Sequence, residues 1–246
     1  MQGRSMKSTR IASRLFALSC LLIQAAITKA GAPEPVAVEL VLAVDTSISV
    51  NAGEYRLQMH GIANAFRSPE ILDIISRQPG GVAVTLVHWS LGSLNHQAVG
   101  WHHLHDFATT TAFANLVETA PRQGAGRGTS IADAIYYSVK LIEGNTYEGK
   151  SRKIDISGDP RSNSGSPPQS ARDIAVARNI TVNGLTIPDG DRQLVDYYRA
   201  YVIGGPDAFV LTVGRDRDFT TAMRLKLERE LNIFLSSNAR RCGTAC

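Results

Sequence analysis

The feature that most constrains the fold is an unbroken apolar segment near the start of the chain. Residues 36–44 read VAVELVLAV, with a single charged residue among Val, Leu and Ala. A strand that is buried on both faces has this composition. The segment runs directly into Asp45-Thr46-Ser47-Ile48-Ser49. The sequence therefore predicts a central strand whose carboxyl end carries a cluster of polar side chains.

Strand-like and helix-like patterns alternate along the rest of the chain. The expected strands are 82–89, 153–157, 180–187 and 208–213, with a short edge strand at 98–101. The expected helices are 51–66, 69–76, 106–119, 129–143, 169–178, 191–202 and 216–235. This alternation indicates an α/β fold, a single doubly wound Rossmann-like domain with a mostly parallel central sheet and helices on both faces. We assign this domain to residues 31–237.

Residues 1–30 have the pattern of a secretory signal peptide. Arg4, Lys7, Arg10 and Arg14 precede the apolar segment 15–27, and Ala30 ends a small-x-small cleavage site. Cleavage after Ala30 is the first choice and after Ala26 the second. A retained membrane anchor is the alternative, but the segment is shorter than the roughly 20 apolar residues that a span needs. We expect an exported product, periplasmic or secreted, without a membrane span after signal cleavage.

Charge and composition exclude several classes of protein. The chain has 43% hydrophobic and 20% charged residues, which is ordinary for a globular protein and not for a disordered chain or a coiled coil. It has 26 Lys and Arg against 22 Asp and Glu; without the five basic residues of 1–30, 21 remain against 22. The mature chain is thus close to neutral, and no basic surface predicts binding to nucleic acid.

The cysteines agree with export. Cys20 lies in the signal peptide, which leaves Cys242 and Cys246 in the C-terminal tail 238–246. An oxidising compartment favours a disulfide between Cys242 and Cys246. Two thiolate ligands of a metal are the alternative, although no second Cys pair or nearby His completes such a site.

Polar side chains follow two of the expected strands and one loop, and all three should lie at the same edge of the sheet. Asp45, Ser47 and Ser49 follow the first strand, Thr129 follows a loop rich in glycine, and Asp159 follows the strand at 153–157. Ligand sites of open α/β sheets lie at the carboxyl ends of the strands. Two carboxylates and three hydroxyls are hard oxygen donors, which suit a divalent cation, Mg²⁺ first and Ca²⁺ or Mn²⁺ otherwise, rather than Zn²⁺.

This arrangement resembles the von Willebrand factor type A (vWA) domain and its metal-ion-dependent adhesion site (MIDAS). More narrowly, the chain is similar to exported bacterial vWA-like proteins of unknown function. The resemblance covers about residues 36–237 and is carried by the segments VELVLAVDTSISV, VTLVHWS, GTSIADAI, KIDISGD, VIGGPDAFVLTV and RLKLERELN. It implies that Asp45, Ser47, Ser49, Thr129 and Asp159 hold the metal, the serines and the threonine as hydroxyl ligands and the aspartates largely through water.

One position departs from the vWA pattern. The usual Thr-Asp-Gly is replaced by Ser157-Gly158-Asp159-Pro160, so the aspartate is shifted by one residue. Asp155 is a weaker substitute, because a residue in the middle of a strand points into a helix layer. The resemblance implies a non-enzymatic binding module whose metal shell is completed by an Asp or Glu of a protein partner. A metal-assisted hydrolase of the phosphatase type and a scaffold with a degenerate metal site are the alternatives.

Each candidate also has a simpler structural interpretation. Asp45, Ser47 and Ser49 are good caps for the helix at 51–66, and Thr129 for the helix at 129–143. His88, His96, His102, His103 and His105 cluster in sequence, and the spacing of His102 and His105 suits a transition metal, but solvated histidines are the expected case. Arg122, Arg127 and Arg161 flank the site, facing either solvent or an acidic partner. The segment Gly124-x-Gly126-x-Gly128 lacks the Lys-Ser/Thr of a phosphate loop.

Overall fold

A computed structural model describes residues 32–187, 190–214 and 219–232. The described residues from Pro33 onward belong to one compact unit. The strands are β1 (Glu34–Asp45), β2 (Val82–Trp89), β3 (His96–Leu104), β4 (Tyr147–Gly158), β5 (Ile180–Thr186) and β6 (Val210–Thr212). The helices are α1 (Ala52–Arg67), α2 (Pro69–Ser76), α3 (Phe107–Thr119), α4 (Ile131–Glu143), α5 (Pro168–Ala177), α6 (Leu194–Tyr197) and α7 (Phe219–Leu231), with short turns η1 (Gly92–Leu94) and η2 (Tyr198–Val202).

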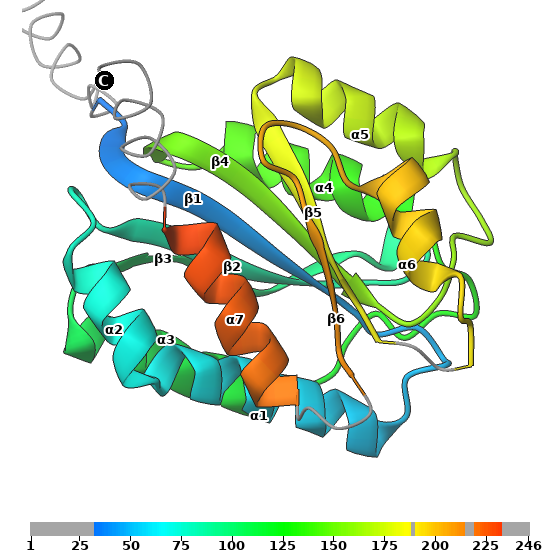
Figure 1. Cartoon of the computed structure of the whole chain (residues 1–246), viewed down its shortest axis with the longest axis horizontal. Helices are drawn as coiled ribbons and strands as arrows, with labels where there is room; N and C mark the ends of the chain where they lie inside the picture. The colour runs from blue at the N-terminus through cyan, green and yellow to red at the C-terminus, as the bar shows by residue number, and fades with distance from the viewer. Residues whose placement is uncertain (1–31, 188–189, 215–218, 233–246) are drawn as a thin grey trace, which may run out of the picture. The chain divides into compact units, whose positions relative to one another are not determined.

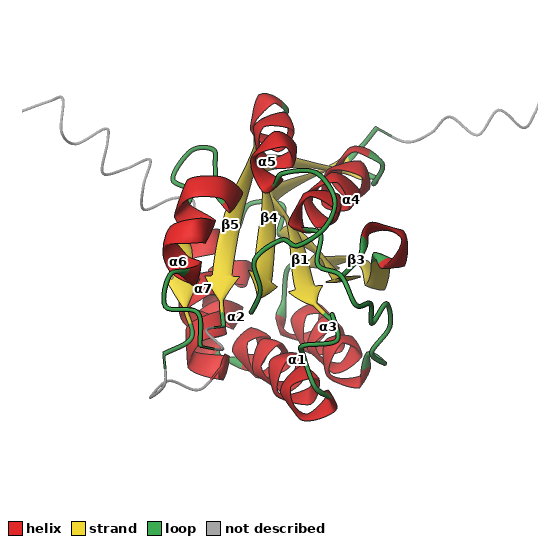
Figure 2. Cartoon of the chain, turned by 90° about the vertical axis from the view of Figure 1, so that its right-hand side faces the viewer, coloured by secondary structure: helices red, strands yellow, loops and turns green. Residues whose placement is uncertain are grey.

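The six strands form one sheet in the order β3-β2-β1-β4-β5-β6. Every pair is parallel except β2 with β3, which places an antiparallel strand at one edge. Helices α1, α2, α3 and α7 cover one face of the sheet, and α4, α5 and α6 cover the other (Figures 1 and 2). The predicted α/β fold with helices on both faces is therefore confirmed.

Strand β1 lies in the middle of this sheet, as its apolar composition requires. All residues from Val36 to Asp45 are buried. The one charged residue of the segment, Glu39, accepts hydrogen bonds from the N–H of Gly149 and the side-chain amide of Asn145, each at 2.6 Å. A buried carboxylate is tolerated here because both of its oxygens have partners.

Local capping sets the starts of the first helices. The Asn51 side chain accepts from the N–H groups of Gly53 and Glu54 at 2.8 and 3.1 Å, and Glu54 closes a capping box. Ser68 caps α2 ahead of Pro69, and Asp106 caps α3. Helix α4 is capped by Ser130, whose side chain accepts from the N–H of Asp133. Helix α1 is thus capped by Asn51 and α4 by Ser130. The interpretation of Asp45, Ser47, Ser49 and Thr129 as caps of α1 and α4 is therefore wrong.

Several expected elements have different bounds in the structure, and three of them bear on the sheet and its edges. The edge strand β3 has nine residues rather than four, and β4 starts at Tyr147 rather than at 153. The first half of β4 is polar and partly exposed, but it pairs with the start of β1 through Glu34 and Tyr147. The helix expected at 191–202 is reduced to α6 and the π-helical turn η2.

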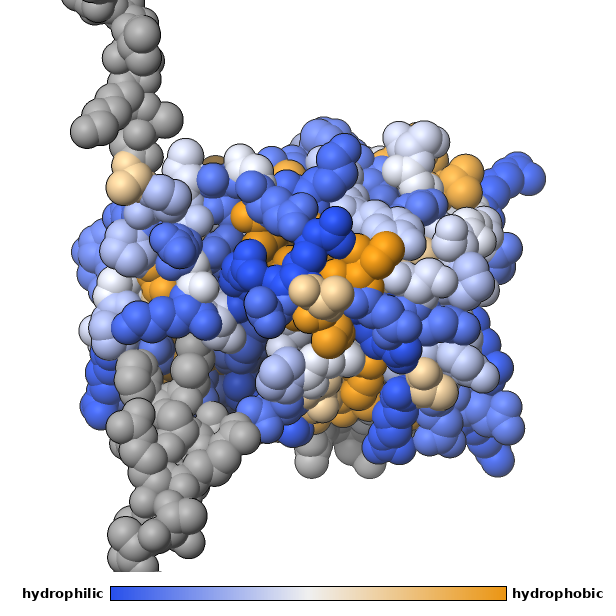
Figure 3. Space-filling model, turned by 90° about the horizontal axis from the view of Figure 1, so that it is seen from above, coloured by the Kyte–Doolittle hydropathy of each residue, from blue (hydrophilic) through white to orange (hydrophobic). Residues whose placement is uncertain are grey.

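Some predictions fall on parts of the chain outside the described residues. These are the signal peptide of residues 1–30, the Cys242–Cys246 disulfide and both ends of the helix expected at 216–235. Within the part that is described, each helix is too short or too polar to cross a lipid bilayer. The outer surface of the layer formed by α4 and α5 is mostly polar, with apolar residues gathered near the centre of the view in Figure 3.

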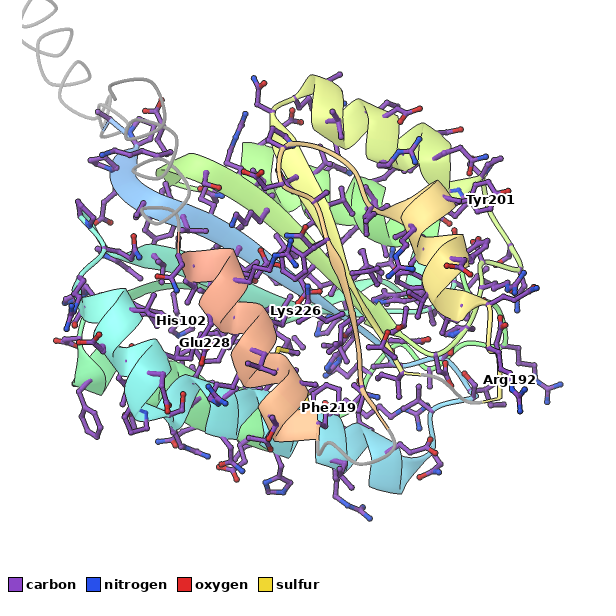
Figure 4. All side chains as sticks on the ribbon, in the orientation of Figure 1. His102, Arg192, Tyr201, Phe219, Lys226 and Glu228 are labelled. Carbon is purple, nitrogen blue, oxygen red and sulfur yellow. The ribbon has the colours of Figure 1, made fainter. Side chains whose placement is uncertain are left out.

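A buried ionic cluster joins α7 to the sheet. The Nζ of Lys226 lies 2.9 Å from an oxygen of Asp155 on β4 and 3.1 Å from one of Glu230 on α7. The side-chain amide of Asn183 on β5 donates to Glu230 at 2.8 and 2.9 Å. Lys226 lies between α7 and the sheet in Figure 4. Asp155 thus points into the helix layer, as its position in the middle of a strand predicts.

Candidate metal centre

Asp45 ends β1 and is fully buried at the carboxyl edge of the sheet. Its Oδ1 accepts a hydrogen bond from the N–H of Ser47 at 2.7 Å. Its Oδ2 has no hydrogen-bond partner among the described residues. A buried polar atom without a partner is costly, and a native structure keeps one where a ligand or a water satisfies it. Asp45 therefore has one oxygen committed to the loop and one available inside the site.

Three further predicted residues form a chain of contacts beside Asp45. The hydroxyls of Ser47 and Ser49 lie 2.9 Å apart, and the Ser49 hydroxyl donates to Oδ1 of Asp159 at 3.2 Å. The alternation of Ser47 and Ser49 after the strand puts both hydroxyls on one side of the loop. Asp159 reaches this group even though Pro160 follows it, because β4 ends at Gly158 and leaves Asp159 as the first residue of the loop.

Thr129 joins the same region through the loop after β4. Its hydroxyl donates to the carbonyl of Arg161 at 3.0 Å, and its N–H donates to the side chain of Asn163 at 2.9 Å. Its carbonyl accepts from the N–H groups of Asn163 and Ser164. These bonds tie the start of α4 to the loop that carries Asp159. The structure thus brings four of the five predicted residues into direct contact and attaches Thr129 to their loop.

Arg122 holds the first loop of the site and was left undecided by the sequence. One of its Nη atoms donates to the carbonyls of Thr46 and Ser47 at 2.9 and 2.8 Å. The Thr46 hydroxyl donates to the carbonyl of Gln123, and the N–H of Ile48 to that of Gly126. Arg122 thus fixes the carbonyl side of this loop, while the Ser47 and Ser49 hydroxyls contact each other and Asp159. No local pattern marks this role, because Arg122 lies 75 residues from Ser47.

Gly158 is a second residue that the sequence did not single out as necessary. A Cβ at this position would lie 3.0 Å from the Trp89 ring and 3.1 Å from Oδ2 of Asp45. Both contacts are closer than side chains normally make, so a residue larger than Gly would press on the site. The Gly that replaces the usual residue before the aspartate is therefore needed for the packing of Asp45.

The electrostatics of the site follow from its burial. Burial raises the pKa of Asp45 to about 7, hydrogen bonds from Ser47 oppose the shift, and the negative charge of Asp159 adds to it. A cation bound beside these carboxylates would favour the ionised form of Asp45. The orphaned Oδ2 and a donor set made only of carboxylate and hydroxyl oxygens fit a hard divalent cation.

The histidine cluster does not form a common site in the structure. His102 and His103 contact the carbonyls of Gly100 and Gly80, at 2.9 and 2.7 Å, and His105 lies 3.6 Å from Asp106. His88 is not solvated but fully buried, which corrects the expectation for this group. Its Nε2 bonds to the Tyr55 hydroxyl at 3.1 Å, and burial lowers its pKa to about 4, so the ring is neutral.

The flanking arginines have different roles. Arg161 pairs with Asp191 at 2.6 Å and lies over the ring of Tyr197, 5.5 Å from its centroid. It is thus engaged within the chain rather than held out toward an acidic partner. Arg127 is exposed on the glycine-rich loop.

Several solved structures have a fold similar to that of this chain. The chain is similar to proximal thread matrix protein 1 from the mussel byssus, in a structure with a zinc-occupied MIDAS motif, with a TM-score of 0.55, 16% identity, and coverage of 80% of this chain and 48% of that chain. It is similar to a von Willebrand factor type A protein from Catenulispora acidiphila, with a TM-score of 0.56, 13% identity, and coverage of 79% and 42%. It is also similar to the vWF domain of the type V pili tip protein Mfa5 from Porphyromonas gingivalis, with a TM-score of 0.53, 11% identity, and coverage of 83% and 96%.

At these identities the likeness concerns the fold alone, and the chain spans about half the length of the mussel protein. No curated protein sequence matches the chain. The model of the family DUF1194, described as a protein of unknown function, matches residues 35–234. The chain therefore belongs to the DUF1194 family, and its fold is that of a von Willebrand factor type A domain.

Proposed function

We propose that this protein is an exported vWA-type binding module. Asp45, Ser47, Ser49, Thr129 and Asp159 would hold a divalent cation, Mg²⁺ before Ca²⁺ or Mn²⁺. An Asp or Glu side chain of a protein partner would complete the metal shell. The observation that carries the proposal is the contact chain from Asp45 through Ser47 and Ser49 to Asp159, next to the unpartnered Oδ2 of Asp45.

The chemistry of the donors supports a hard cation with open coordination positions. The five side chains supply oxygen only, and two carboxylates nearly balance a divalent charge. A cation held in this way keeps room for a further oxygen ligand. The bound cation would supply the positive charge that attracts the acidic side chain, while the chain's own residues fix its position. The mussel protein of the same fold carries zinc in its MIDAS motif, which supports a divalent ion in general.

The same residues support binding rather than catalysis. A phosphatase that uses Asp45 as nucleophile would need a second acid two residues later, and this position holds Ser47, whose hydroxyl contacts Ser49. We therefore assign no catalytic step to the site. Export rests on the signal-like pattern of residues 1–30, and mass spectrometry of the mature product would test cleavage after Ala30 and the Cys242–Cys246 disulfide.

Calorimetric titration of the full chain with MgCl₂, MnCl₂ and CaCl₂ tests the proposal, with a thermal melt at each metal concentration. We expect wild-type protein to give a binding heat and a rise in Tm. Asp45→Ala should lose both, Ser47→Ala and Ser49→Ala should be weaker binders than wild type, and Thr129→Ala should be affected least. Asp173→Ala is the control, because Asp173 is an exposed carboxylate of α5 that pairs with Arg172. Wild-type protein that shows neither heat nor a Tm shift at millimolar metal would contradict the proposal and leave a scaffold with a degenerate site.

A further inference from the structure

Three large apolar side chains are exposed on the loops at the metal edge of the sheet. Ile48 is 63% exposed, Leu91 40% and Leu94 38%. Single exposed apolar residues are common and need no explanation, but a group that shares one support is different. We call these three residues the apolar rim.

The glycine-rich loop is the support for the two leucines. A Cβ at Gly126 would lie 2.8 Å from Leu94 Cδ1, and one at Gly128 would lie 3.2 Å from Leu91 Cδ1. A Cβ at Gly124, whose φ is +73°, would collide with the carbonyl oxygen of Leu94. The three glycines thus let both leucines lie directly on the backbone of the loop. The need for glycine at these three positions is thus explained in part by the two leucines; Ser90 and Ser164 lie equally close to Gly126 and Gly128.

Ile48 is attached to the same loop from the other side. It lies between the proposed ligands Ser47 and Ser49, and its N–H donates to the carbonyl of Gly126 at 2.9 Å. Leu91 and Leu94 are joined by a hydrogen bond from the N–H of Leu94 to the carbonyl of Leu91 at 2.8 Å. The apolar rim is therefore continuous with the proposed metal site and is built on hydrogen-bonded backbone. The backbone that carries the rim is thus already ordered, so that its ordering adds little to the entropy cost when a partner covers the rim.

We propose that the apolar rim binds an apolar side chain of the protein partner, beside the acidic residue that completes the metal shell. The proposal rests on the proposed function. Its ligand is a protein segment with Leu, Ile, Met or Phe within about two residues of an Asp or Glu. The spacing is short because Ile48 of the rim lies between the proposed ligands Ser47 and Ser49, and consecutive Cα atoms are about 3.8 Å apart. Charge complementarity supports an acidic segment, because the cation and the exposed Arg127 of the same loop are both positive.

The energetic contribution of the rim should be moderate. Complete burial of a Leu or Ile side chain is favourable, and the rim residues are already covered in part. We expect each rim residue to change the affinity for a matching segment by about three- to tenfold.

An array of short synthetic peptides tests the inference with the full-chain protein in MgCl₂. Each peptide carries one central Asp or Glu, and its neighbours are varied one at a time. Wild-type protein should bind peptides with Leu, Ile, Met or Phe beside the acid about tenfold more tightly than the same peptides with Ser there. Leu91→Ser and Leu94→Ser should lose this preference while they keep the Mg²⁺ binding heat and the binding of acidic peptides. Leu94→Ala serves if the serine variant does not fold.

Phe107→Ser is the matched control. Phe107 is 69% exposed at the start of α3, and β3, which precedes it, ends opposite Val82 at the far edge of the sheet. This variant should bind every peptide as the wild type does. Acidic peptides bound without an apolar preference, or an unchanged preference in Leu91→Ser and Leu94→Ser, would overturn the rim and leave the metal site standing. Absence of Mg²⁺ heat, or Mg²⁺ binding without any acidic peptide bound, would overturn the proposed function together with the rim.

Discussion

Two aspartates four residues apart, Asp155 in β4 and Asp159 in the loop directly after it, lie in opposite electrostatic situations. Asp155 faces α7, where Lys226 lies 2.9 Å away and also contacts Glu230. Burial lowers the pKa of Lys226, but the two carboxylates more than offset this effect, and the net shift is upward. Asp159 faces the metal edge, where it contacts Ser49 and adds to the raised pKa of Asp45.

The difference separates a carboxylate that is paired with a lysine from two carboxylates that lie near each other. Inside the domain, the chain supplies its own cation, and the cluster joins α7 to β4 and β5 as a self-contained unit. At the edge, Asp45 Oδ2 is left without a partner among the described residues, and the charge that perturbs Asp45 is another carboxylate. Burial acts on both groups, but Asp155 has the charge of Lys226 beside it, whereas Asp45 is held partly protonated near neutral pH by burial and by Asp159.

The largest expected effect concerns the buried cluster. Lys226→Met would leave Asp155 buried without its cation and Glu230 with Lys153 alone, 3.7 Å away, which should lower the free energy of unfolding by about 3–5 kcal/mol. Urea denaturation would measure this loss. Adding Asp155→Asn and Glu230→Gln to Lys226→Met should recover part of it, because the uncompensated charges are then removed. Lys140→Met, at an exposed position of α4, is the control and should match wild type; a similar result for Lys226→Met would refute the structural role.

An intermediate effect is expected for Asp45, at the carboxyl edge of the sheet. Without metal, its burial should make the folded chain less stable as the pH rises. The pKa of Asp45 is about 7 in the folded chain against 3.8 as its ordinary value, so the folded chain binds a proton more tightly between these pH values. The contribution of Asp45 to the stability of the metal-free protein should therefore fall as the pH rises from about 4 to about 7, and Asp45→Asn should remove this contribution while those of Asp155 and His88 remain.

Bound Mg²⁺ should stabilise the wild type but not Asp45→Asn. At a hundredfold excess over Kd, Mg²⁺ should stabilise wild type by about 2.7 kcal/mol and leave Asp45→Asn unchanged. Thermal melts at pH 8, with MgCl₂ and with EDTA, would measure both arms. Equal stabilisation of the two proteins would show that Asp45 does not bind the ion.

The smallest effect is expected at Arg122, which shapes the loop without touching the proposed ion. Arg122→Gln should weaken Mg²⁺ binding by about tenfold, or about 1.4 kcal/mol, because two charge-assisted hydrogen bonds to the carbonyls of Thr46 and Ser47 are lost. Arg127→Gln on the same loop preserves these bonds and should bind as wild type does. Calorimetry on both variants decides whether loop position matters; identical affinities would mean that it does not.

Much of the fold was predictable from local sequence. Asn51 with Glu54, Ser68 with Pro69, and Asp106 with Thr109 mark helix starts that the structure reproduces, because caps are satisfied within one turn. The bounds of α2 and β2 agree residue for residue. Pairing along β4 was not predictable, since its polar first half becomes a strand only when β1 lies beside it.

Periodicity and residue chemistry are local properties, and they were enough to predict the alternation of elements, the central place of β1 and the candidate oxygen ligands Asp45, Ser47, Ser49, Thr129 and Asp159. The folded chain was needed to show that Lys226 pairs with Asp155, that Arg122 binds the carbonyls of the first loop and that Ser49 reaches Asp159. These contacts join positions 71, 75 and 110 residues apart, and no local pattern encodes which distant charge or hydroxyl a side chain meets.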